Sequence, residues 1–295
     1  MVLPLITEDQ RLKESRGIKG CIFGKSGIGK ISLLWTLPEE TTLFFDLEAG
    51  DLVLEGWRGN TMRPRPWEEC RDFAVLIGGS NPRLPAAQFY SQKHFEEGCH
   101  SFGSVEELPI YETVFIDSIT VAARLCFAWC KAQSEFLSDK IKKTAIRGAY
   151  GLLAQESIAW LSRLQHTRNK NIWFLDILDE KTDDFNRRYF EPQIEGTKTG
   201  LELSGIVDQV ITMAAIDREG NASGKAQRTP YWAFVCHTIN PYGYPAKDRS
   251  GRLDCIEESH LDHLMAKIQG KFNPVSQRLD DTCPHSSIQQ ESLGD

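Results

Sequence analysis

The sequence lacks any apolar stretch long enough to cross a membrane. Its longest apolar region, residues 113–130, contains Asp117 and Arg124, whereas a spanning helix needs about 20 mostly apolar residues. A secretory leader is not apparent either, because Glu8 and Asp9 follow a short apolar start where a basic segment and a long apolar core would be expected. We therefore expect no membrane partner and a cytoplasmic location.

The sequence also lacks a CxxC motif and an excess of positive charge. None of the eight cysteines forms a CxxC pair, and His94, Cys99 and His100 have no second ligand pair to complete a zinc site. We expect free thiols. The formal net charge is -7, so any contact with nucleic acid must use a local basic surface.

Apolar runs alternating with helical patterns predict an α/β domain with a mainly parallel sheet flanked by helices, and an antiparallel hairpin at one edge. Residues 78–108 are long for a loop and predict an insertion with some structure of its own. We expect a flexible segment at 1–16, a domain at 17–268 and a flexible polar tail at 269–295. The expected strands are 18–23, 42–47, 111–117, 171–178, 206–215 and 230–237, and the expected helices are 31–37, 67–77, 119–137, 147–168 and 257–268.

A G-x-x-x-x-G-K motif follows the first expected strand. Backbone amides of such a loop, placed between a strand and a helix, point at a phosphate, and the lysine neutralises its charge. The motif predicts a nucleotide site. It comprises Gly24, Lys25, Ser26, Gly27, Ile28, Gly29 and Lys30, with Ile31 and Ser32 following in the expected helix.

Two acidic residues end the next expected strands. Asp117 follows Val114–Ile116, where a carboxylate can hold the water shell of Mg²⁺. Glu48 follows 44–47 and can polarise an attacking water. The alternatives are a strand-ending Asp that caps the next turn and a solvated Glu. Asp46 is the weaker choice of base because it alternates to the other side of its strand.

The chain resembles the RecA-like core ATPases in four segments. These are the phosphate loop at 24–30, FFDLE at 44–48, VFIDS at 114–118 and KDRSG at 247–251. It is most similar to the phage and prophage RecA-like, single-strand-annealing ATP-binding proteins, and the resemblance covers roughly residues 17–268. From this resemblance we expect a RecA-like P-loop NTPase fold. We also expect a role in DNA recombination inside a bacterial host cell.

The resemblance also implies roles for matching residues. Lys30 would hold the β- and γ-phosphates of ATP, Asp117 would be the acid near Mg²⁺, and Glu48 would activate water. Lys247 and Arg249 would act in trans on the nucleotide of a neighbouring copy in a ring or filament. From the residues alone, a solvated charged turn is the alternative for this pair. The implied partners are single-stranded DNA, further copies of the chain and a single-strand-binding protein.

The connector 179–200 is the expected DNA-facing segment of such a protein. It interleaves basic residues with Tyr189 and Phe190, a mixture suited to phosphate contact and base stacking. Six acidic residues lie there too, so a solvated loop with a packed aromatic pair is an equal alternative.

Position 31 departs from the phosphate-loop motif, which has Ser or Thr after the lysine. Ile31 cannot ligate Mg²⁺, and Ser32 should point elsewhere. We therefore expect nucleotide binding with impaired Mg²⁺-dependent hydrolysis. Two other functions stay open: a nucleotide-gated interaction protein without catalysis, and a P-loop small-molecule kinase with 78–108 as its lid.

Overall fold

The computed structural model describes residues 5–14, 16–102, 108–133, 142–195, 197–217 and 230–270. Ten strands join in one sheet within these ranges, in the order β10-β8-β7-β1-β5-β4-β2-β3, with β6 paired to β5 and β9 to β7. The strands are β1 (Lys19–Gly24), β2 (Thr42–Asp46), β3 (Asn60–Met62), β4 (Thr113–Asp117), β5 (Asn171–Thr182), β6 (Arg188–Pro192), β7 (Gln209–Asp217), β8 (Pro230–Val235), β9 (Lys247–Asp248) and β10 (Ile256–Glu258).

The central strands are parallel and the edge beyond β7 is antiparallel. Parallel pairing joins β7, β1, β5, β4, β2 and β3. Antiparallel pairing joins β8 to β7 and β10 to β8. The predicted α/β architecture, with a mainly parallel sheet and an antiparallel hairpin at one edge, is thus confirmed. The hairpin's turn, predicted at 217–224, lies almost wholly outside the described residues.

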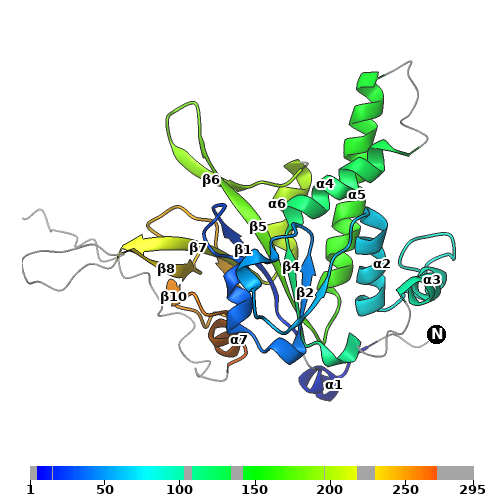
Figure 1. Cartoon of the computed structure of the whole chain (residues 1–295), viewed down its shortest axis with the longest axis horizontal. Coiled ribbons are helices and arrows are strands. Elements are labelled where there is room, and N and C mark those ends of the chain that lie inside the picture. The colour runs from blue at the N-terminus through cyan, green and yellow to red at the C-terminus, as the bar shows by residue number, and fades with distance from the viewer. Residues whose placement is uncertain are drawn as a thin grey trace, which may run out of the picture.

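Helices cover both faces of the sheet (Figure 1). Side chains of successive strand residues point to opposite faces, so each buried strand contributes to two apolar clusters. One cluster joins the sheet to α2 (Trp67–Gly78), α4 (Ile119–Lys131), α5 (Lys142–Gln165) and α6 (Thr197–Ile206). The other joins it to the 3-10 helix η1 (Ile31–Thr36) and to α7 (Leu261–Ile268). Phe45, Ile116 and Phe174 belong to the first cluster, and Phe44, Phe115 and Trp173 to the second.

The helix after the phosphate loop is a 3-10 helix of six residues, not the α-helix expected over 31–37. Pro38 limits its length, because the residue before a proline is pushed into an extended conformation, and Leu37 has φ -110° and ψ 150°. The Thr36 hydroxyl also donates to the carbonyl oxygen of Leu33 at 2.7 Å, which competes with backbone bonding. The turn is therefore short and tightly wound.

The expected connector at 179–200 is largely regular structure. β5 continues to Thr182 and pairs with β6 in an antiparallel hairpin that extends beyond the sheet (Figure 1). The carboxylate of Asp183 accepts from the backbone amides of Phe185 and Arg187, each at 2.8 Å, and Asn186 takes the left-handed conformation. A turn of this kind reverses the chain, so the charged end of β5, which extends past its pairing with β1 and β4, pairs with β6.

The other segments depart from expectation in smaller ways. The insertion contains α3 (Gln92–Phe102), which packs on α2. The expected helix 257–268 begins only at Leu261, because residues 256–258 form β10. Part of the expected helix 119–137 lies outside the described residues. The remaining short helices are α1 (Glu8–Lys13), within the segment predicted to be flexible, and the 3-10 helices η2 (Glu39–Thr41), η3 (Asp51–Leu54) and η4 (Leu108–Ile110).

The expectation about thiols is correct for six cysteines, and Cys255 differs because it is disulfide-bonded. The described part of the chain holds no cluster of three or more His, Cys, Asp or Glu side chains that could bind a metal. Nor does any of the described helices combine the length and apolarity needed to span a bilayer.

Candidate functional site

The phosphate loop connects the carboxyl end of β1 to η1. Gly27 and Gly29 have φ of 75° and 95°, which glycine adopts without steric cost. The Lys30 side chain crosses back over the loop, where its ammonium donates to the carbonyl oxygens of Gly24 at 2.8 Å and Lys25 at 3.1 Å. The lysine thus lies, largely buried, inside the concave face of the loop.

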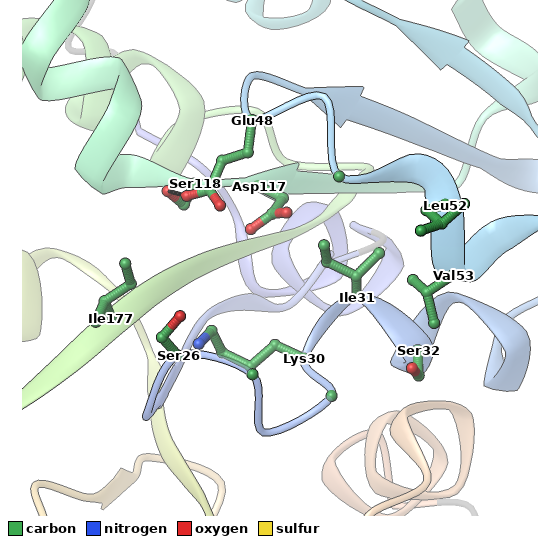
Figure 2. A pocket seen from close by; sticks show the side chains of 13 residues that line it. Ser26, Lys30, Ile31, Ser32, Glu48, Leu52, Val53, Asp117, Ser118 and Ile177 are labelled. Carbon is green, nitrogen blue, oxygen red and sulfur yellow. Dashed lines mark hydrogen bonds between the residues drawn. The ribbon is translucent and has the colours of Figure 1, made fainter.

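A cavity of about 400 Å³ lies over this loop, which is the size range of small-molecule sites. Figure 2 shows Ser26 and Lys30 on one side of it and Glu48, Asp117 and Ser118 on the other. The parallel register creates this arrangement, because loop and acids follow the carboxyl ends of β1, β2 and β4. The described residues that line it are Ser26, Gly27, Gly29, Lys30, Ile31, Ser32, Glu48, Gly50, Leu52, Val53, Asp117, Ser118 and Ile177.

The two predicted acids meet at this site in different environments. Asp117 is buried, and no described residue forms a hydrogen bond with its Oδ2. Burial raises the pKa of Asp117 to about 7; the charge of Glu48 adds to this, and Lys30 opposes it. Glu48 accepts a hydrogen bond from the Ser118 hydroxyl, which fixes its carboxylate beside Asp117.

Asp46 has a structural role in the same region. Its carboxylate accepts from the backbone amide of Ala49 at 2.7 Å and from Nε of Arg63 at 3.1 Å. The contacts hold the start of the β2–η3 connection, which positions Glu48 and the cavity residues Gly50, Leu52 and Val53.

Sequence reasoning missed one further buried carboxylate, that of Asp176. Asp176 lies near the end of the β5 segment that pairs with β1, fully buried. Its Oδ1 accepts from the Thr120 hydroxyl at 2.5 Å and from the Ile177 amide at 2.8 Å, while Oδ2 has no hydrogen-bond partner in the described part of the chain. Burial raises the pKa of Asp176 to about 7, although both hydrogen bonds and Lys30 oppose the shift. The available signal was an acid inside the apolar run 171–178.

Lys30 stands among these acids. Burial lowers the pKa of its ammonium, and the opposing influences come from nearby anionic groups. The carboxylates that oppose the shift are those of Asp117, Asp176 and Glu48. The site therefore holds one buried cation against three acidic groups, two of which have a raised pKa.

Asp176 should make the stability of the chain depend on pH. Its pKa rises from 3.8 in the unfolded chain to about 7 in the fold, so between these values the folded chain holds a proton that the unfolded chain has lost. The free energy of unfolding should then fall as pH rises through this interval, by roughly 4 kcal/mol at most. Asp117 contributes in the same direction.

Urea unfolding at about pH 5 and about pH 8 measures this dependence. Asp176→Asn should flatten it clearly, whereas Asp9→Asn, which alters an exposed carboxylate on α1, should leave it unchanged. If the free energy of unfolding changed equally between the two pH values in all three proteins, the raised pKa of Asp176 would be contradicted.

Ile31 and Ser32 both line the cavity but differ in direction. In Figure 2 the Ile31 side chain extends toward Asp117, whereas Ser32 points to the other side of η1. Neighbouring residues of a 3-10 helix are about 120° apart, which explains the divergence.

Lys247 and Arg249 are not brought to this cavity. Lys247 lies on β9, which pairs with the first residues of β7. These lie toward the amino end of β1, whereas the phosphate loop follows its carboxyl end. The Lys247 ammonium donates to the carbonyl oxygen of Ser204, and Arg249 binds Asp208 at 2.9 Å and the carbonyl oxygen of Gly205 at 3.0 Å.

Comparison with family models identifies the kind of domain. A family model described as an AAA domain matches residues 16–250. The chain belongs to this family. Such a domain is a P-loop NTPase, so membership implies nucleotide binding. A comparison with curated proteins finds no match.

Proposed function

We propose that this AAA domain binds ATP and acts on single-stranded DNA, in recombination by strand annealing of the phage type. The observation that carries the ATP assignment is the position of Lys30, whose ammonium is held by loop carbonyls and faces a 400 Å³ cavity with Glu48 and Asp117 opposite. The assignment of the protein to strand annealing rests on the motif resemblance and on the β5–β6 hairpin.

A triphosphate in this cavity would find complementary groups at both ends. The loop amides and the Lys30 ammonium face the phosphates, because Lys30 can exchange its carbonyl partners for phosphate oxygens. Leu52 and Val53 give one wall an apolar surface suited to the base or sugar. Glu48, oriented by Ser118, is the group placed to polarise an attacking water.

The β5–β6 hairpin supports the assignment to DNA through its aromatic residues. Phe185 at its turn is 78% exposed and Tyr189 is 39% exposed, and exposed rings stack on bases. Its basic side chains are paired with carboxylates: Lys181 with Glu191, Arg187 with Asp183 and Arg188 with Glu180. Stacking is therefore the main interaction that we expect.

Phe185→Ala should weaken the binding of single-stranded DNA about tenfold, because stacking contributes roughly 1–3 kcal/mol per base. Fluorescence anisotropy with a labelled oligonucleotide at low salt measures the affinity. Leu12→Ala, which removes a similarly exposed apolar side chain from α1, is the matched control and should bind like the unaltered protein. If both variants bind equally well, the hairpin is not the DNA surface.

The hairpin is also joined to the phosphate loop. Lys25 of the loop pairs with Glu180 of β5 at 3.1 Å, and the other oxygen of Glu180 pairs with Arg188 of β6 at 3.3 Å. A nucleotide that attracts Lys25 would compete with this pair. The arrangement supports a link between nucleotide occupancy and the DNA-facing hairpin.

Self-association is part of the proposal. Lys247 and Arg249 cannot reach the cavity of their own chain, and the Arg249 side chain is half exposed, so a neighbouring copy would receive it in a ring or filament. A cation supplied in trans makes hydrolysis depend on assembly. Sedimentation velocity with and without ATP tests whether the chain self-associates. A single-strand-binding protein is a further proposed partner.

A second function, nucleotide-gated interaction without catalysis, is favoured by Ile31, because that position lacks the usual hydroxyl. ATP turnover with and without single-stranded DNA separates the two. Turnover stimulated by DNA supports the annealing protein, and binding without turnover supports the gated one. The insertion contains α3, which packs on α2, and none of its described residues lines the cavity.

A further inference from the structure

The space beside Asp117 is occupied by a methyl group. A Cβ added to Gly50 would lie 2.8 Å from Cδ1 of Ile31 and 3.9 Å from Oδ2 of Asp117. The end of the Ile31 side chain and the Asp117 carboxylate therefore border the same small volume, which Figure 2 shows between the loop and β4. In a phosphate loop of the usual sequence, the residue at this position carries the hydroxyl that binds Mg²⁺.

The neighbouring oxygen atoms do not compensate for this methyl group. Ser32 points away from Asp117 (Figure 2). Glu48 accepts a hydrogen bond from Ser118, and the Asp46 carboxylate accepts hydrogen bonds from Ala49 and Arg63. Asp117 Oδ2 has no hydrogen-bond partner among the described residues. Mg²⁺ requires near-octahedral oxygen coordination and loses its water reluctantly, so one carboxylate beside an apolar wall is a poor donor set.

Charge compensation by the protein is available from another source. Lys30 is a buried cation inside the loop, held by the carbonyl oxygens of Gly24 and Lys25. Lys30 and the loop amides can therefore hold the phosphates without a metal bound to the protein.

We propose that this cavity takes a nucleoside triphosphate without magnesium coordinated by the protein, so that the metal adds nothing to affinity. The proposal deepens the assigned ATP site and rests on it. Ile31 is the residue that determines it: an oxygen at position 31 would create the missing ligand, whereas another β-branched apolar side chain would not.

The experiment is a titration of the full chain with ATP by calorimetry, in excess EDTA and in excess Mg²⁺. We expect Mg²⁺ to tighten binding by less than about threefold. Ile31→Thr should bind like the unaltered protein in EDTA and at least about tenfold more tightly in Mg²⁺. Ile31→Val, which keeps the branched apolar shape, should show no such gain.

Each outcome distinguishes the inference from the ATP assignment. Binding of the unaltered protein that Mg²⁺ tightens by more than about threefold overturns the inference and leaves the ATP site standing. No binding in either buffer refutes the ATP site itself. Should Ile31→Thr unfold, Ile31→Ser provides the second test: Mg²⁺ should tighten its ATP binding at least about tenfold, and no gain over the unaltered protein overturns the inference.

Discussion

Lys30→Ala should weaken ATP binding about 100-fold. Its ammonium is held inside the loop by the carbonyl oxygens of Gly24 and Lys25, at the position where phosphate oxygens would replace them. Hydrogen bonds to charged groups contribute about 1.5–3 kcal/mol each, and about 1.4 kcal/mol is a factor of ten in affinity. Removal also leaves the Asp117 and Asp176 carboxyl groups without their nearest buried cation, which would repel the phosphates further. Calorimetric titration with ATP measures the change.

Lys25→Ala is the matched control, because it removes the same charge from the same loop. The Lys25 side chain is 59% exposed and pairs with Glu180, so solvent screens its charge. Its loss should cost a few-fold in affinity at most. Thermal denaturation of both variants checks that they are folded. Equal ATP affinity in folded Lys30→Ala and Lys25→Ala would contradict the assigned role of Lys30.

Gly20→Ala should destabilise the chain by about 3 kcal/mol or more. Gly20 lies opposite Trp173 in the β1–β5 ladder, and an added Cβ would come within 2.1 Å of Cζ3 and 2.4 Å of Cε3 of that ring. The indole is fully buried, and its Nε1 contacts Sδ of Met265 at 3.1 Å, so it has no free space to move into. Urea unfolding measures the loss.

Gly151→Ala provides the opposite case. Gly151 lies on α5, and an added Cβ meets no atom within 4 Å. Alanine is favoured over glycine inside a helix by roughly 1 kcal/mol, so this variant should be slightly more stable. If Gly20→Ala proved as stable as Gly151→Ala, the close packing of Trp173 against β1 would be wrong.

The sheet and phosphate loop could be predicted because their sequence patterns reflect local rules. Buried parallel strands are continuous apolar runs, and residues such as Phe44 and Phe45 can fill opposite faces without a polar partner. The loop motif specifies its own glycines and lysine. The acids Glu48 and Asp117 follow adjacent strands, so their meeting at one edge follows from parallel order.

The remaining features depend on contacts between distant segments. The β5–β6 hairpin joins two charged stretches whose pairing, such as Lys181 with Glu191, is not visible as an apolar period. Asp176 of β5 accepts a hydrogen bond from Thr120 of α4. The location of Lys247 and Arg249 follows from β9 joining β7, and no local pattern indicates which edge of a sheet a two-residue strand will join.

A crystal structure of the chain with a non-hydrolysable ATP analogue tests the central claim most directly. The account predicts the triphosphate in the cavity over 24–30, with the Lys30 ammonium transferred from the carbonyl oxygens of Gly24 and Lys25 to phosphate oxygens. Glu48 and Asp117 should lie on the far side of the phosphates. A nucleotide bound elsewhere, or a Lys30 that keeps both carbonyl partners while the phosphates lie outside the loop, would contradict it.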